Sequence, residues 1–309
     1  MVVQEESLAE APEQVERADA HLLRPTNQTL PLRIYGSKAF HRALPTPLAL
    51  RLAALRGRLE WYAVTRRRAE ALELTEAIRG LPRESPEAAR FARRRLVEDA
   101  VLAELQWRPW LGRTIPIEGV ERLARAREAG RGVIFATAHI GPFLGVVHAL
   151  AAREIKVYVA GGQTGPEPEF DGRRGRWTLM QNRWVEDCGA RWVHLGGSYR
   201  LLKALLERGE VCVMTVDAPG EIEVELAGHP ARVRSGVASL ALETGAPIIP
   251  GATLRRGWGQ AVTLFGPVEP ADFDDSLQLT YHLVDVLGEV LLHDPEQAHD
   301  NVFQLWERG

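Results

Sequence analysis

Two ionisable residues, His139 and Asp217, each come directly after an apolar run of strand length, at residues 133–138 and 211–216. In open α/β sheets, ligands bind at the carboxyl ends of the strands, where the loops converge. A lone histidine can be purely structural, but histidine is also the usual general base at neutral pH. Gly141 begins a turn into an expected helix, whose first N–H groups could bind an oxyanion. The residues therefore predict a site at a sheet edge where His139 accepts a proton from a substrate.

Several common catalytic motifs are absent from the sequence. It has no G-x-S-x-G elbow, no G-x-x-x-x-G-K-[ST] loop, no G-x-G-x-x-G after a strand and no H-E-x-x-H. A base without a protein nucleophile predicts activation of a hydroxyl group on the substrate itself, and hence direct group transfer. We expect no cofactor and no metal site, with the activated donor acting as a co-substrate.

The composition is ordinary for a globular chain, with 45% hydrophobic and 26% charged residues and a net charge of -3. That charge gives no support for nucleic-acid binding, which needs a basic face. Nearly all of the positive charge is arginine, which binds phosphate and carboxylate bidentately. Cys188 and Cys212 are too few and too far apart to indicate a disulfide framework or a metal site.

The location of the chain is predicted from its apolar runs. No run of about 18 apolar residues exists, so no transmembrane span is expected. The acidic, polar residues 1–19 are unlike a signal peptide. We therefore expect a cytoplasmic protein that meets the membrane only from its surface, on the inner face of the plasma membrane.

Three regions are expected along the chain. Residues 1–30 lack periodicity and predict a flexible lead, residues 31–112 predict a helical region, and residues 113–309 predict an α/β domain. Within the helical region, residues 47–64 place leucines among arginines and end in aromatic residues. That pattern fits a helix at a membrane interface, and it fits equally a helix packed on its own domain. Ser85 followed by Pro86 predicts the capped start of another helix.

In the α/β region, strands are expected to alternate with helices, which implies parallel strands and right-handed crossovers. The fold class is therefore α/β, with a mixed, mostly parallel central sheet flanked by helices and an N-terminal helical extension. A hairpin is expected over 221–234 with its turn at Ala227 and Gly228. The long Gly/Pro/acidic loop over 161–175 is a candidate functional loop. Strands are expected at 133–138, 155–160, 191–195, 211–216, 247–253 and 260–265, and helices at 121–129, 142–153, 176–187, 199–208, 235–243 and 277–292.

Several sequence blocks resemble the lipid A biosynthesis lauroyl/myristoyl acyltransferase family, part of the lysophospholipid acyltransferase superfamily. The order and spacing of the blocks together make the resemblance specific, and it extends over most of the chain. The blocks are residues 117–121, 130–141, 201–217, 228–231, 235–241, 244–250 and 294–297.

The resemblance implies transfer of a fatty acyl chain from acyl carrier protein or coenzyme A to a hydroxyl of a lipid or glycolipid. On this basis His139 would deprotonate the acceptor hydroxyl, and N–H groups near Gly141 would stabilise the oxyanion. Arginines in the region that follows the strand expected at 155–160 would bind an acceptor phosphate. The substrate-binding residues implied are Gly141, Arg173, Arg176, Arg183, Ser235 and Gly236.

One departure from the family pattern bears on activity. The family has His, four intervening residues and then Asp or Glu, but that last position holds Leu144. A histidine base that lacks its carboxylate can lose several orders of magnitude in rate. Three possibilities stay open: Asp217 supplies the carboxylate, the enzyme works slowly or on an unusual acceptor, or the chain is a non-catalytic relative that binds lipid or carrier protein.

Overall fold

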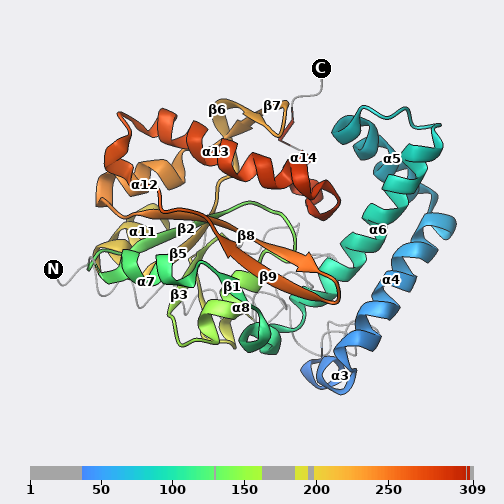
Figure 1. The fold of residues 1–309 in the computed structure, drawn as a ribbon, viewed down its shortest axis with the longest axis horizontal. Coiled ribbons are helices and arrows are strands. Elements are labelled where there is room, and N and C mark those ends of the chain that lie inside the picture. Colours follow the sequence, from blue (N-terminus) through green and yellow to red (C-terminus); the bar gives the residue numbers. More distant parts are fainter. Residues whose placement is uncertain (1–36, 129, 162–184, 194–197, 304, 307–309) are drawn as a thin grey trace.

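The computed structural model describes residues 37–128, 130–161, 185–193, 198–303 and 305–306. Residues 1–30, residues 162–175 of the Gly/Pro-rich loop and most of the helix expected at 176–187 lie outside the described residues. The described part contains a central sheet, helices on both of its faces and a group of N-terminal helices at one side (Figure 1).

The central sheet has the strand order β1-β9-β8-β2-β5-β3-β4 in the described residues. Strands β8, β2, β5, β3 and β4 run parallel, whereas β9 is antiparallel to β8 and β1 is parallel to β9. This arrangement confirms the expected mixed, mostly parallel sheet. The strands are β1 Ile117–Glu118, β2 Val133–Thr137, β3 Val157–Ala160, β4 Arg191–Val193, β5 Val211–Thr215, β8 Ile248–Arg256 and β9 Gly259–Leu264.

The middle of the sheet is buried on both faces, which is why β2 and β5 are continuous apolar runs. Ile134 and Ala136 of β2 pack with α11 Ser198–Glu207, α12 Gly236–Thr244 and α13 Ser276–His293. Val133 and Phe135 point to the other face, where α7 Val120–Glu128 and α8 Gly145–Ala151 pack. The β2 strand is thereby fixed in a three-layer core, and its carboxyl end has a defined position.

A hairpin carries the chain from β5 to α12. It consists of β6 Pro219–Leu226 and β7 His229–Val233, paired antiparallel. Ala227 and Gly228 connect the strands with φ values of 53° and 81°. Two central residues with positive φ are what a two-residue hairpin turn requires, so the predicted turn is confirmed.

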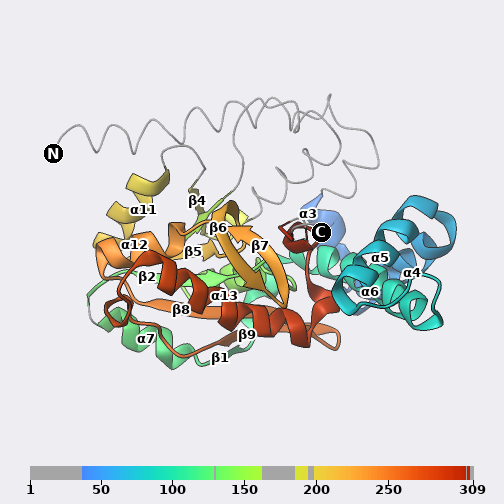
Figure 2. The ribbon, with the colours of Figure 1, turned by 90° about the horizontal axis from the view of Figure 1, so that it is seen from above.

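The N-terminal helices are α3 Lys38–Ala43, α4 Thr46–Ala63, α5 Thr65–Arg79 and α6 Pro86–Gln106. Figures 1 and 2 both place α4, α5 and α6 together at one side of the sheet. The Ser85 hydroxyl accepts a hydrogen bond from the N–H of Ala88, 3.1 Å away, which confirms the predicted cap of α6. Helix α4 crosses α6 at Gly57, where an added Cβ would lie 2.5 Å from the carbonyl oxygen of Leu96. No helix among the described residues is long and apolar enough to cross a bilayer.

Candidate active site

The carboxyl ends of β2 and β5 bring His139 and Asp217 together. The two strands are parallel neighbours, and Thr137 pairs with Thr215. Each ionisable residue lies two positions beyond its threonine, so both side chains leave the sheet at the same level. Asp217 Oδ1 lies 2.9 Å from His139 Nδ1, and Asp217 Oδ2 accepts a hydrogen bond of 2.7 Å from the backbone N–H of His139. One carboxylate therefore fixes both the ring and the backbone of His139.

The contact with Asp217 determines the tautomer of the His139 imidazole. Because a carboxylate only accepts hydrogen bonds, Nδ1 carries the proton and Nε2 has a free lone pair in the neutral ring. No residue in the described part of the chain hydrogen bonds to Nε2. The His139 side chain is 23% exposed, while that of Asp217 is fully buried. The pair therefore presents a basic nitrogen, supported from behind by a buried carboxylate.

Two opposing effects act on the pKa of His139. Burial lowers this pKa, but the charge of Asp217 and its hydrogen bond to the ring act in the other direction and outweigh burial. The net result is a pKa above the ordinary histidine value. Such an imidazole holds an accepted proton more firmly than a free histidine does.

The turn after His139 depends on Gly141. This residue has a φ of 59°, and an added Cβ would lie 2.0 Å from the carbonyl oxygen of Thr253 in β8. Only glycine fits this combination of left-handed backbone and close approach. The N–H of Gly141 donates to the carbonyl oxygen of Gln297 at 2.8 Å. The N–H of Gly141 itself is therefore already engaged within the protein.

The segment around Gln297 holds the His139 turn in place. Ala298 forms an antiparallel bridge with Ile140, and the N–H of His299 donates to the carbonyl oxygen of His139 at 2.9 Å. The His299 Nε2 lies 2.7 Å from the carbonyl oxygen of Gly141. In the sequence, only residues 294–297 of this segment resemble the family, and no local pattern indicates a role for His299. Nothing local could have revealed this pairing, because about 160 residues separate the two segments.

Phe143 lies between the two histidines of this turn. Its ring meets His139 and His299 edge to face, with centroid distances of 5.1 and 5.4 Å. Burial lowers the pKa of His299, and the neighbouring charge of His139 lowers it further, against the opposite effect of the Gly141 carbonyl. His299 is thus a neutral, structural partner of the turn.

Leu144, at the position of the family acid, is buried and belongs to the apolar cluster with Phe135 and Val146. It also ends the turn that precedes α8, so this helix starts at Gly145 rather than at Pro142 as expected. The carboxylate beside His139 comes from the neighbouring strand instead. Of the possibilities left open by the sequence, the geometry matches the one in which Asp217 supplies the acid.

The remaining sequence-predicted residues divide into two groups. Ser235 and Gly236 start α12, beside the turn that follows Asp217, because the N–H of Arg234 donates to the carbonyl oxygen of Ala218. Ser235 precedes the first residue of α12 but makes no side-chain cap, and its hydroxyl is 3.3 Å from that of Ser239. An added Cβ on Gly236 would meet nothing within 4 Å, so the backbone there is accessible. Arg173, Arg176 and Arg183 lie outside the described residues.

Comparison with known proteins gives one family. The family described as bacterial lipid A biosynthesis acyltransferase matches residues 94–299, which is more than half of the 309 residues. No curated protein matches the chain. Among solved structures, the chain is similar to the 1-acyl-sn-glycerophosphate (LPA) acyltransferase PlsC from Thermotoga maritima, with 15% sequence identity and a TM-score of 0.38. That match covers 81% of this chain and 99% of the other.

Proposed function

Because the chain belongs to the bacterial lipid A biosynthesis acyltransferase family, we propose that it transfers a fatty acyl group to a hydroxyl of a lipid or glycolipid. The donor is a thioester of acyl carrier protein or of coenzyme A. The observation that carries the proposal is the contact between His139 Nδ1 and the buried carboxylate of Asp217. It gives His139 the orientation and the tautomer of a general base.

The reaction proceeds by direct transfer. The acceptor hydroxyl gives its proton to His139 Nε2 as its oxygen forms a bond to the thioester carbonyl carbon. The tetrahedral intermediate then collapses, the C–S bond breaks, and the imidazolium returns the proton to the leaving thiolate. Asp217 stabilises the imidazolium between these two steps without itself accepting the proton.

Substrate binding is assigned to residues around this pair. Ser235 and Gly236 lie beside the turn after Asp217, where the accessible backbone of Gly236 leaves room for a substrate. We assign Arg173, Arg176 and Arg183 to an acceptor phosphate, since guanidinium groups bind phosphate bidentately. These three assignments rest on the family resemblance alone.

The second candidate is a non-catalytic relative that binds lipid or carrier protein. Leu144 favours it, because the usual acid of the family is replaced by an apolar side chain. Asp217 weighs against it, since a carboxylate is within hydrogen-bonding distance of His139. We therefore prefer the enzyme.

We also propose that the protein binds to the inner face of the plasma membrane and that α4 contacts the bilayer. One face of α4 packs on α6, so the interpretation of residues 47–64 as a helix packed on its own domain holds for that face. The other face is an apolar stripe, defined here as Leu48, Leu52, Leu55, Leu59 and Tyr62, with side chains 45% to 69% exposed. Exposed Arg51, Arg56 and Arg58 are interleaved with the stripe. An apolar face bordered by arginines suits an anionic bilayer surface.

An acylation assay tests the function. The protein is incubated with total membrane lipid and labelled acyl donors of both carrier types, and wild type is compared with His139→Ala. We expect labelled lipid from wild type and loss of product in the variant. His293→Ala, which removes an exposed histidine of α13, is the matched control and should retain activity. Unchanged product from His139→Ala would refute the role of His139, and no product from wild type with either donor would favour the binding protein.

A further inference from the structure

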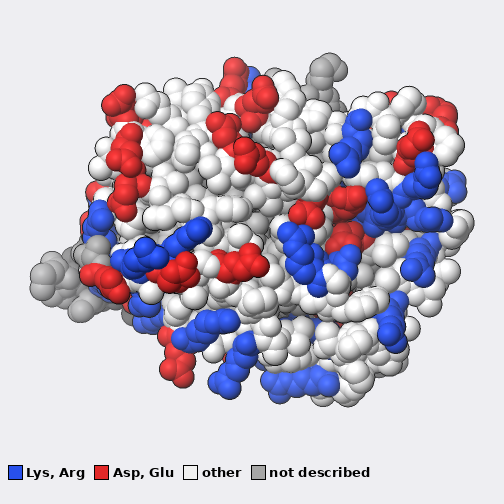
Figure 3. Space-filling model, in the orientation of Figure 1, with Lys and Arg blue, Asp and Glu red and all other residues white. Residues whose placement is uncertain are grey.

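A hollow of about 680 Å³ opens between α4, α6, the end of β8 and the segment that follows α13. Four arginines from three of these elements converge on it. Figure 3 shows basic side chains gathered over the part of the surface where Figure 1 places α4 to α6. The residues that line the hollow are Arg58, Tyr62, Arg93, Arg94, Val97, Glu98, Arg255, Asp294, Glu296 and Gln297.

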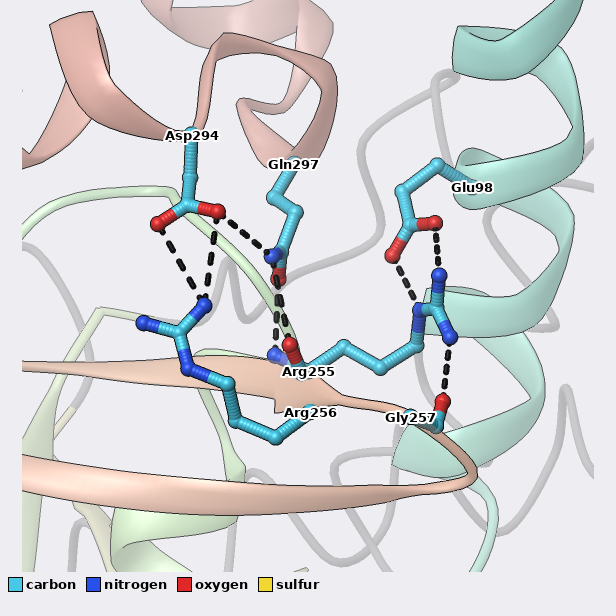
Figure 4. A network of polar contacts seen from close by, with 6 residues as sticks. All are labelled: Glu98, Arg255, Arg256, Gly257, Asp294 and Gln297. Atoms are coloured by element: carbon cyan, nitrogen blue, oxygen red, sulfur yellow. Dashed lines mark hydrogen bonds and ion pairs between the residues drawn. The ribbon is translucent and has the colours of Figure 1, made fainter.

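Each carboxylate in the hollow is already paired with an arginine. Glu98 binds the Arg255 guanidinium, which also donates to the carbonyl oxygen of Gly257 (Figure 4). Asp294 accepts from Arg256 at 3.4 Å, and Glu296 lies 3.3 Å from Arg94. Each of these acidic groups therefore already offsets the charge of one arginine.

Two arginines of the hollow are not neutralised. Arg58 of α4 and Arg93 of α6 have no hydrogen bond or ion pair with any residue in the described ranges. Their helices are held together at Gly57, which adjoins Arg58 in sequence, so both guanidinium groups are carried by a rigid support. Two uncompensated positive charges in a concave surface concentrate the electrostatic field there and attract anions.

We propose that this hollow binds a phosphate group through Arg58 and Arg93. Guanidinium groups bind phosphate oxygens bidentately, and the four arginines enter from different sides. Arg58 lies between Leu55 and Leu59 of the apolar stripe, so the hollow opens beside the surface assigned to the bilayer. The phosphate can therefore belong to a lipid headgroup or be free in solution.

The hollow is separate from the His139 site but is joined to it by Gln297. The side chain of this residue lines the hollow. Its Oε1 accepts a hydrogen bond from the backbone N–H of Arg255, and its Nε2 donates one to the carbonyl oxygen of Arg255. Its carbonyl oxygen accepts the N–H of Gly141 in the turn after His139. The short segment that lines the hollow therefore also holds the turn after His139.

The test measures binding without an acyl donor, so its outcome does not depend on whether the protein is an acyltransferase. Titration calorimetry uses inorganic phosphate, and co-sedimentation uses phosphatidylcholine vesicles with or without phosphatidic acid. Wild type is compared with Arg58→Gln, Arg93→Gln and the double variant. The control is Arg90→Gln, which removes the same charge from the exposed surface of α6 outside the hollow.

We expect the double variant to bind at least about tenfold more weakly than wild type and the control, since two charge-assisted contacts are lost. A loss confined to vesicles with phosphatidic acid identifies a lipid headgroup, and a loss confined to inorganic phosphate identifies a soluble ligand. Equal binding of the double variant and Arg90→Gln to every probe, or no binding of any probe by wild type, would overturn the proposal. Thermal unfolding of each variant verifies that the exposed substitutions leave the fold intact.

Discussion

At the level of single residues, the proposed role of His139 as general base predicts how activity depends on pH. The base must be neutral to accept a proton, and the contact with Asp217 raises the pKa of its ring. Activity should therefore rise with pH through a pKa above the ordinary histidine value of about 6.5. Below that pKa the imidazole is already protonated and cannot act as the base.

Asp217→Asn should lower the rate and move this rise to lower pH. The amide removes the negative charge that raises the pKa of His139, and it can stabilise the wrong tautomer of the ring. A loss on the order of 10⁴ in kcat is expected, as for the equivalent substitution in a serine protease triad. The measurement is kcat/KM against pH for wild type and variant. A pH profile that does not move would contradict the assigned role of Asp217, whatever the change in rate.

The pKa of His148 is shifted in the opposite direction from that of His139, and this shift affects stability rather than catalysis. It is buried in α8, and neither ring nitrogen has a partner in the described residues. Burial lowers its pKa to about 4. As pH falls from the ordinary value, the unfolded chain binds a proton that the folded chain does not, so stability is lost in this window.

We expect wild type to lose about 3 kcal/mol more unfolding free energy than His148→Leu between neutral pH and about pH 4. Urea unfolding at several pH values measures this difference. The substitution of the exposed His293 by leucine is the control, since it removes an imidazole from the surface rather than from the interior. If His148→Leu were as acid-sensitive as wild type, His148 would not be a neutral buried group.

At the level of elements, the turn between β2 and α8 determines where His139 lies. Gly141→Ala would place a methyl group against the backbone of Thr253 and would also require a left-handed conformation. Gly80→Ala, at the end of α5, requires a similar conformation with φ of 61° but meets nothing within 4 Å. The two substitutions therefore share the conformational cost, about 1–2 kcal/mol, and differ only in the steric contact.

We expect Gly141→Ala to destabilise the protein by about 1–3 kcal/mol more than Gly80→Ala, because the turn must move away from β8. Only Gly141→Ala should also lower acylation activity, since the moved turn carries His139. Denaturant unfolding and the acylation assay together check this prediction. Equal effects of the two substitutions on stability would show that the turn adapts to the methyl group.

The elements differ in how well the sequence predicts them. Strands such as β2 and β5 are buried on both faces, and this burial appears directly as an apolar run. The start of α8 could not be predicted, because the turn from Ile140 to Phe143 is held by the distant residues Gln297 and His299. Similarly, the leucine and arginine pattern of α4 does not tell which leucines pack on α6 and which stay exposed.

At the level of the whole molecule, the site results from strand order. His139 and Asp217 could each be assigned to a strand end from the sequence, but their contact requires β2 and β5 to be neighbours in register. Sequence patterns give no strand order, so Asp217 could only be one possibility among three. The loss of the family acid at Leu144 is local and visible in the sequence, whereas the carboxylate that contacts His139 belongs to a residue 78 positions further along the chain.

The orientation of the whole molecule on a membrane should depend on the apolar stripe of α4. Leu55→Gln and Leu59→Gln together should reduce binding to anionic phospholipid vesicles by about tenfold or more, because these side chains would no longer enter the bilayer interface. Their exposure in the folded protein means that the melting temperature should hardly change.

The matched control is Leu277→Gln with Leu292→Gln, two leucines of α13 that are also exposed but lie on a different part of the molecule. Vesicle co-sedimentation at low and high salt measures binding, and salt should weaken the contribution of the interleaved arginines but not that of the leucines. Equal binding of the two double variants would remove α4 as the membrane contact. If the stripe variant bound vesicles normally but changed its sedimentation coefficient, a second copy of the chain would cover the stripe instead. The salt dependence therefore separates the apolar stripe from the arginines beside it, and the α13 control separates the stripe from a general loss of surface hydrophobicity.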